Sequence, residues 1–329
     1  MRGDPSAIVA AALTGILVGA AMVSTRAVSA DASPATLAFL RYLIGLCVLI
    51  GPAWLGMRTR TRTRTRTRTR FARKDAAVLA GLGVCQFAVL IVLLNHALGV
   101  LSAATCALVF STMPLFTMLL AVLSGQEAFS LPKLTGLVCA VSGVGVLLHG
   151  APLGGTGGGT HLGAMAALIG ATVIGAVSSL LVRPLLQRYP ALPTSVLAMC
   201  AAVVFLLALC ATTGQPLWPS LSLTQWGHVA FIGLSSGVGY FCWLWALTRL
   251  EASRVVGFQA LGPVTAAVLE LLVGRQWPSG SLLVSIALVV SGLLIAQQGR
   301  TVARSGTRRQ PGLLEEGADH AGPGRRPAP

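Results

Sequence analysis

The chain has 329 residues, of which 54% are hydrophobic and only 10% charged, and its formal net charge is +15. Soluble domains carry about 25% charged residues, so nine acidic residues in this length cannot cover a water-soluble surface. Composition therefore excludes an ordinary soluble enzyme or binding domain and indicates a polytopic helical membrane protein.

Apolar runs of about 20 residues, the length of helix that crosses the hydrocarbon layer, recur along the chain and are separated by turn-forming residues. The predicted spans are 6–25, 34–56, 76–98, 102–123, 131–149, 162–182, 192–213, 226–248, 252–273 and 281–298. The first could instead be a signal peptide, because Val28-Ser29-Ala30 resembles a cleavage site. We favour a retained helix, since the apolar run Ala7 to Val23 exceeds the usual length of roughly 7–15 residues.

The chain repeats itself at an offset of 149 residues, which places Ala97-Leu98 on Ala246-Leu247 and Pro114 on Pro263. An internal repeat has to be considered before a fold is assigned. Each half holds five spans. Because five is an odd number, the second half enters the membrane from the opposite side and is inverted relative to the first. We therefore predict an all-α fold of ten transmembrane helices in two inverted five-helix repeats, an architecture that many secondary transporters use.

The predicted organisation has four parts. They are a first repeat at 1–149 that includes an Arg-Thr low-complexity loop at 58–70, a Gly-rich linker at 150–161, a second repeat at 162–298 and a disordered tail at 299–329. Cytoplasmic loops carry the excess of Lys and Arg. Most basic residues lie on the side of the N-terminus, so we expect both termini in the cytoplasm of a bacterial cell and the spans in its cytoplasmic membrane.

The stretch from Ala97 to Leu148 resembles the repeat of the EamA-type transporters of the drug/metabolite transporter superfamily. The resemblance rests on Ala97-Leu98, the mid-helix Pro114, the turn Gly125…Glu127…Ser130 and the pair Gly136…Gly143, most of which recur in the second half. Gln276, where the family commonly has Glu, and Ser285, opposite Gly136, depart from the pattern. The resemblance implies a ten-helix exporter or exchanger of small metabolites, often amino acids or drug-like compounds.

We therefore expect a secondary transporter that exports small metabolites, such as amino acids or related carboxylates, by alternating access. A multidrug efflux transporter is the alternative, and a non-transporting membrane sensor or assembly protein is an alternative of another class. No carboxylate pair, Ser-His-Asp set or phosphate loop supports an enzyme, a cofactor or a metal site, and the oligomeric state stays open. Proton antiport and facilitated diffusion both remain possible means of coupling.

The run RTRTRTRTRTRTR from Arg58 to Arg70 is the most conspicuous low-complexity segment. At the cytoplasmic face it should contact anionic headgroups, at about 1 kcal/mol per basic residue. We favour a tolerated insertion that helps topology over nucleic-acid binding, because aromatic residues are missing from the run. The seven cysteines fall inside spans and form no C-x-x-C pair, which indicates packing residues.

Pro114 and Pro263 lie near the middle of the fourth and ninth spans, at matching repeat positions. Proline removes a helix hydrogen bond, and paired interruptions in two halves point to a transporter's binding site. We predict that these helices face each other across a central cavity, with Ser111, Thr112 and Gln259 near it. A kink that only shapes packing is the alternative.

Other candidates lie on the second and eighth spans. Ser236, Tyr240 and Trp243 share one helix face, which either lines a cavity or packs. Arg41 is the only basic residue deep in a span and Glu270 the only acid well inside one. We predict that Arg41 faces the cavity, either paired with Glu270 or free to hold a substrate carboxylate, whose geometry suits a guanidinium. Snorkelling of Arg41 to the outer headgroups is the alternative.

Overall fold

The computed structural model describes residues 5–60, 71–125, 131–149, 158–247, 249–250, 255, 258–274 and 279–307. In these ranges the chain is helical apart from short turns and an irregular connection at 213–222. The elements are α1 (Pro5–Val28), α2 (Pro34–Arg60), α3 (Arg73–Val84), the π-helical turn η1 (Cys85–Val89), α4 (Leu90–Leu98), α5 (Ala103–Phe110), α6 (Met113–Leu123), α7 (Leu131–His149), α8 (Gly158–Arg188), α9 (Ala191–Thr212), α10 (Leu223–Leu247), the 3₁₀ turn η2 (Phe258–Ala260), α12 (Leu261–Gly274) and α13 (Gly280–Thr307).

Helical segments occupy all ten predicted spans, which confirms the all-α polytopic fold. Within the described ranges, five helices are long and apolar enough to cross a membrane, and four shorter apolar helices accompany them. Three spans depart from a single α-helix. The third contains η1, the fourth is divided into α5 and α6, and the described part of the ninth begins with η2 before α12.

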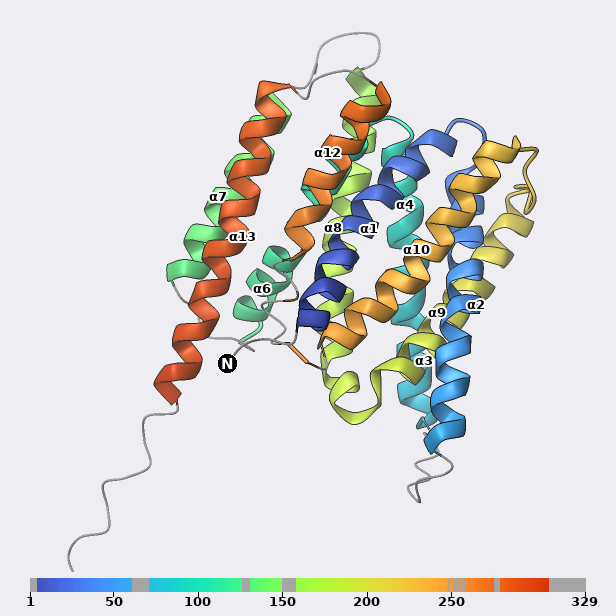
Figure 1. The fold of residues 1–329 in the computed structure, drawn as a ribbon, viewed down its shortest axis with the longest axis horizontal. Helices are drawn as coiled ribbons and strands as arrows, with labels where there is room; N and C mark the ends of the chain where they lie inside the picture. The colour runs from blue at the N-terminus through green and yellow to red at the C-terminus, as the bar shows by residue number, and fades with distance from the viewer. Residues whose placement is uncertain are drawn as a thin grey trace, which may run out of the picture.

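The helix contacts follow the two repeats. α1 packs on α10 as α4 packs on α8, α2 packs on α10 as α3 packs on α9, and α1 packs on α12 as α6 packs on α8. Equivalent helices also pack on each other, in the pairs α2 with α9, α5 with α12 and α7 with α13. Exchanging the halves therefore reproduces the main contacts. Figure 1 shows α1 and α8, the first helices of the two halves, running in opposite directions, as inverted repeats require.

Glycines allow the closest helix crossings. A Cβ atom added at Gly15 would overlap the carbonyl oxygen of Phe258, and one added at Gly19 would overlap that of Gly262. In the same way α7 and α13 approach through Gly143 and Gly292, which are equivalent in the repeat. Small residues let helix backbones approach closely where a membrane offers no hydrophobic driving force between helices. This fixes α1 against the start of α12.

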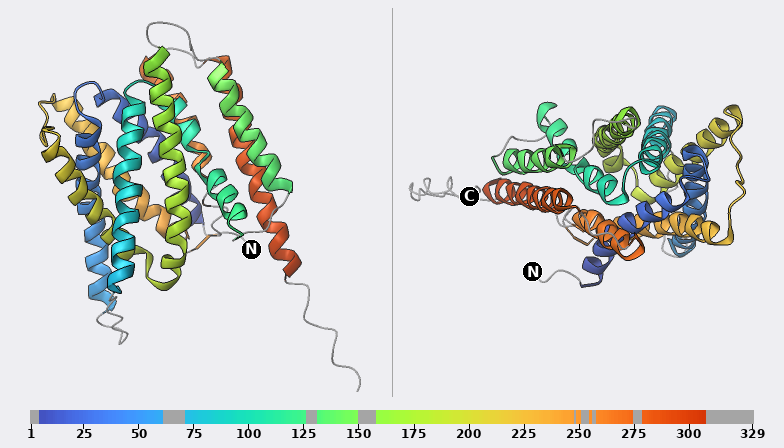
Figure 2. Two further views of the ribbon diagram at one scale, coloured as in Figure 1. Left: turned by 180° about the vertical axis from the view of Figure 1, so that it is seen from behind. Right: turned by 90° about the horizontal axis from the view of Figure 1, so that it is seen from above.

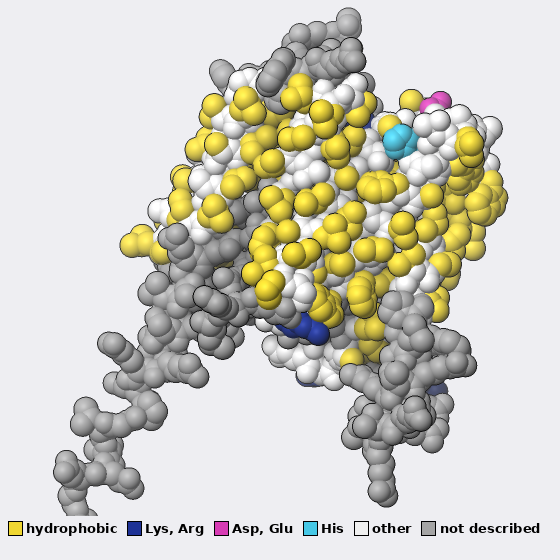
Figure 3. Space-filling model, viewed as in Figure 1, with side chains coloured by type: hydrophobic (Ala, Val, Ile, Leu, Met, Phe, Trp, Pro, Cys, Tyr) yellow, Lys and Arg dark blue, Asp and Glu magenta, His cyan; other side chains and the backbone are white. Residues whose placement is uncertain are grey.

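The surface is apolar where a bilayer would surround it. In Figure 3 hydrophobic side chains cover most of the visible described face, with acidic atoms at its upper edge and basic atoms at its lower edge. Both views in Figure 2 show α7 and α13 side by side at one end of the molecule. Side chains such as Leu123, Leu131 and Val273 are exposed on helix surfaces, which is the arrangement expected of lipid-facing positions.

Some predicted boundaries fall differently. α8 begins at Gly158, inside the predicted linker, and α13 continues to Thr307, inside the predicted tail. α2 extends to Arg60, so only the start of the Arg-Thr run is described, and residues 61–70 lie outside the described ranges. The same holds for linker residues 150–157 and tail residues 308–329. The domain limits therefore stay predictions.

Candidate functional site

Arg41, on α2, lies among polar and aromatic residues from several helices. Its Nε donates a hydrogen bond to Ser236 Oγ on α10 at 2.7 Å, and Ser236 Oγ donates in turn to the Ile232 carbonyl at 2.7 Å. The guanidinium carbon lies 5.9 Å from the centre of the Tyr42 ring. Arg41 Nη1 is buried and has no hydrogen-bond partner within the described structure. The guanidinium is thus held by one edge, with a buried donor still unused.

Three aromatic rings lead from the residue next to Arg41 to Ser195 on α9. The centroids of Tyr42 and Phe87 lie 5.3 Å apart, and those of Phe87 and Tyr240 lie 6.0 Å apart with the rings nearly perpendicular. Edge-to-face contacts of this kind are favourable. The Tyr240 hydroxyl lies 2.6 Å from Ser195 Oγ on α9. We call Arg41, Tyr42, Phe87, Ser195, Ser236 and Tyr240 together the Arg41 site.

The third span contributes Phe87 from η1, a π-helical turn between α3 and α4. Such turns often mark functional positions. The preceding residue, Gln86, also has a buried Oε1 atom without a partner in the described structure. Sequence reasoning missed both residues. The available signal was Gln86 itself, an amide in an otherwise apolar part of the third span.

The fourth span is interrupted at Ser111 and Thr112, which keep right-handed helical dihedrals between α5 and α6. α5 ends at Phe110 and α6 begins at Met113, and Pro114 occupies the first turn of α6, where a helix does not need its N–H. At this position the missing N–H group of the proline costs α6 no hydrogen bond. Within the gap, Ser111 Oγ donates to the Leu108 carbonyl at 2.7 Å and Thr112 Oγ1 to the Val109 carbonyl at 2.6 Å.

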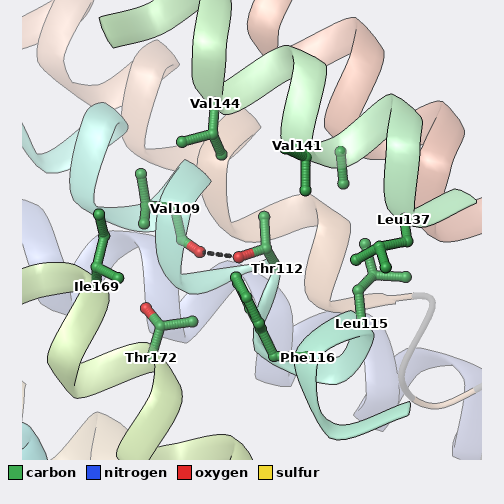
Figure 4. A pocket seen from close by; sticks show the side chains of 10 residues that line it. Val109, Thr112, Leu115, Phe116, Leu137, Val141, Val144, Ile169 and Thr172 are labelled. Atoms are coloured by element: carbon green, nitrogen blue, oxygen red, sulfur yellow. Dashed lines mark hydrogen bonds between the residues drawn. The ribbon is translucent and has the colours of Figure 1, made fainter. Parts of the chain in front are cut away.

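A cavity of about 110 Å³ adjoins this break. Thr112 and Phe116 line one side of it, and residues of α7 and α8 line others, as Figure 4 shows. Its lining is almost wholly apolar, because Thr112 and Thr172 direct their hydroxyl hydrogens to carbonyls of their own helices. The remaining lining residues are Val109, Leu115, Leu137, Ala140, Val141, Val144 and Ile169.

The ninth span repeats the interruption. Gln259 lies in η2, and Pro263 is buried in the first turn of α12. α12 packs directly on α5, so the two interrupted helices are neighbours. The cavity beside Thr112 is lined from α5, α6, α7, α8 and the break, and not by Gln259 or Pro263. This cavity therefore does not unite the two interrupted spans, and a central cavity between them stays a prediction.

Glu270 does not pair with Arg41, which corrects one of the two predicted arrangements. Its carboxylate accepts hydrogen bonds from the backbone N–H groups of Ala103 at 2.6 Å and Ala104 at 3.1 Å. Arg26 Nε lies 3.9 Å from the same carboxylate. A carboxylate is favoured at a helix N-terminus, where N–H groups are unpaired and the dipole is positive. Glu270 therefore joins α12 to the start of α5 and to the end of α1.

Trp243 also departs from its expected neighbours. Ser236 and Tyr240 both belong to the Arg41 site, but Trp243 packs in a separate apolar cluster with Ala7, Ala10 and Leu250. Trp243 lies about one turn after Tyr240 on α10, where α10 packs against the start of α1. The three residues are therefore not brought to one site.

Two polar contacts join helix ends at opposite faces of the bundle. The Tyr189 hydroxyl, after α8, donates to Asp75 Oδ2 at the start of α3 at 2.7 Å. Gln225 Nε2, at the start of α10, donates to Asp31 Oδ2, after α1, at 2.5 Å. Because α8 and α3 in one contact are equivalent to α1 and α10 in the other, these contacts are related by the repeat.

Comparisons with known proteins agree with this architecture. The model of the family described as "EamA-like transporter family" matches residues 5–149 and 161–297. A protein of Streptantibioticus cattleyicolor named "Probable terminal-alkyne amino-acid exporter" is 27% identical over 82% of this chain and 84% of its own length. The "Aromatic amino acid exporter YddG" of Ancylobacter novellus is 29% identical over 59% of this chain and 66% of its own.

A solved crystal structure shares the fold. It superposes with a TM-score of 0.63 at 22% sequence identity and covers 91% of this chain and 99% of its own. At this identity the likeness concerns the fold alone.

Proposed function

This chain belongs to the EamA-like transporter family, and on that premise we propose that it is a secondary transporter that exports small carboxylate-bearing metabolites of the amino-acid class. The observation that carries the substrate class is the buried Nη1 of Arg41, which has no hydrogen-bond partner among the described residues. Relatives whose names refer to amino-acid export support the same class.

The physical argument begins with the cost of burying a charge. A guanidinium inside a membrane protein faces a partner or water, because an uncompensated charge there is expensive. Ser236 fixes the Nε edge of Arg41, so the remaining donors are oriented before a ligand arrives. A carboxylate satisfies two of these donors at once and neutralises the charge. A cationic drug neither accepts hydrogen bonds from these donors as a carboxylate does nor neutralises the charge, so the site favours carboxylates over cationic efflux substrates.

Alternating access is the movement that we propose for this fold. Inverted repeats rock against one another around a central site, and interrupted helices commonly line that site. Both interrupted spans, α5 with α6 and η2 with α12, meet where α12 packs on α5. The contacts of Asp75 with Tyr189 and of Asp31 with Gln225 join helix ends at the two faces. We propose that these two contacts open in turn during the cycle.

The orientation that we propose places both termini in the cytoplasm of a bacterial cell. α1 begins and α13 ends on the same side of the bundle (Figure 1). The exposed basic residues Arg73, Lys74 and Arg188 lie at helix ends on that side, where the positive-inside rule puts the cytoplasm.

Transport by the purified protein in liposomes tests this proposal. Vesicles are loaded with a labelled amino acid, and its efflux is compared with that of the corresponding amine, which lacks the carboxylate, and of a lipophilic cationic drug. We expect flux of the amino acid only. Flux of the drug with none of the amino acid would favour the multidrug alternative. The absence of flux for every compound, from protein that is folded by circular dichroism, would favour a sensor or assembly role.

A further inference from the structure

Gln86, the residue before Phe87 of the Arg41 site, presents a second unsatisfied polar atom. Its Oε1 is buried without a partner in the described part of the chain, a condition it shares with Arg41 Nη1 and Asn95 Oδ1. Buried polar atoms are nearly always hydrogen-bonded, so each exception calls for an explanation such as a bound water or ligand. Asn95 differs from the other two, because its Nδ2 already donates to the Pro34 carbonyl and ties α4 to the start of α2.

The position of Gln86 connects it to Arg41. Gln86 precedes Phe87, whose ring packs on Tyr42, the residue that follows Arg41. η1 packs on α2 and on α9, the helices that carry Arg41 and Ser195. Arg41 and Gln86 are therefore the chain neighbours of two residues whose rings are in contact. A π-helical turn also interrupts the regular hydrogen-bond ladder at this residue, as such turns often do at functional sites.

The two unsatisfied atoms have opposite hydrogen-bonding character. Arg41 Nη1 is a donor and Gln86 Oε1 is an acceptor. An α-amino acid offers the complementary pair, since its carboxylate accepts hydrogen bonds and its ammonium group donates them. We infer that Gln86 accepts a hydrogen bond from the ammonium group of the substrate, and so makes the Arg41 site select α-amino acids over carboxylates that lack the amino group. This inference rests on the proposed function.

A neutral amide suits this role better than a carboxylate would. An acidic side chain at position 86 would bring a negative charge to the proposed site and repel the substrate carboxylate. The amide oxygen accepts from an ammonium group while leaving Arg41 available. A site built to bond a substrate group rejects an analogue that lacks the group, because its own buried atom is then left unpaired.

The test compares phenylalanine with 3-phenylpropionate, which differs from it only by the missing amino group. Their inhibition constants for export are measured in wild type, in Gln86→Met, which removes the acceptor while keeping the side-chain length, and in Gln187→Met. Gln187 is exposed on α8 and serves as the matched control. We expect Gln86→Met to bind phenylalanine about tenfold more weakly, the change from losing one hydrogen bond to a charged group. We expect its affinity for 3-phenylpropionate to stay as in wild type.

Retained binding of 3-phenylpropionate shows that the variant is folded. If Gln86→Met weakens the binding of both compounds equally, the inference is overturned and Gln86 is a packing residue. An unchanged preference for phenylalanine over 3-phenylpropionate would overturn it too. The proposed function fails separately, when Arg41→Gln leaves the binding of both compounds unchanged. An Arg41→Gln variant that weakens both, beside a Gln86→Met variant with wild-type preference, would overturn only the role of Gln86.

Discussion

Replacing Glu270 with glutamine removes a charge that holds three helices together. Two backbone N–H groups at the start of α5 donate to its carboxylate, at 2.6 and 3.1 Å. A hydrogen bond to a charged group contributes about 1.5–3 kcal/mol, and the helix dipole adds about 0.3–1 kcal/mol. The side chain is 25% exposed, which places these contributions toward their lower ends.

Glutamine keeps one acceptor oxygen but presents an amide NH₂ to the second N–H group. We therefore expect Glu270→Gln to lose one bond and the dipole interaction, or about 2 kcal/mol of unfolding free energy. Glu270→Asp keeps the charge on a shorter side chain and should lose less. Reversible unfolding in mixed detergent micelles measures both variants.

A Glu270→Gln variant within about 0.5 kcal/mol of wild type, the usual range for surface substitutions, would refute this role for the carboxylate. A structural role also predicts that transport by Glu270→Gln keeps whatever dependence on a pH gradient the wild type has. Loss of that dependence in a variant of wild-type stability would instead identify Glu270 as a coupling acid.

Two further predictions concern packing and the contacts between helix ends. Gly19→Val should prevent stable folding, because even a Cβ atom at this position overlaps α12. Gly81→Ala should be neutral or stabilise by up to about 1 kcal/mol, since a Cβ atom at Gly81 meets nothing within 4 Å. The two variants are compared by the yield of monodisperse protein after solubilisation in detergent. Tyr189→Phe removes the bond to Asp75, and Asp31→Asn weakens the contact at the opposite face. At about 1 kcal/mol per bond, each substitution should shift the ratio of the two access states about fivefold, and the two shifts should be in opposite directions. Labelling of introduced cysteines from either side of the membrane measures the ratio. Shifts in the same direction would contradict alternating access.

The membrane fold could be predicted because its signals are carried by composition and spacing. Apolar length identified the spans, and the offset that aligns Pro114 with Pro263 identified the duplication. Paired prolines also indicated the interrupted helices. The form of the interruption did not follow, because a proline is compatible with a kink inside a helix and with the first turn of a new one.

The partners within the site could be predicted only in part. Arg41 and Glu270 are conspicuous as charges in apolar spans, but charge alone does not say which groups meet. Glu270 lies beside Arg26, which the sequence places at a helix end, and beside two backbone N–H groups, which no sequence pattern reveals. Phe87 and Gln86 were missed because the prediction identified the third span by its apolar length alone, which does not reveal a π-helical turn.

The central claim, that Arg41 holds the carboxylate of an exported substrate, is tested most directly by substrate affinity in Arg41 variants. Affinity for a labelled amino acid is measured for wild type, Arg41→Lys and Arg41→Gln, with Arg188→Gln as a control at an exposed position on α8. We expect Arg41→Lys to bind about tenfold more weakly, because an ammonium group lacks the two-pronged geometry, and Arg41→Gln about a hundredfold more weakly. Membrane insertion should stay as in wild type, and so should the weak binding of the corresponding amine, which lacks the carboxylate. Wild-type affinity in both Arg41→Lys and Arg41→Gln would contradict the assignment.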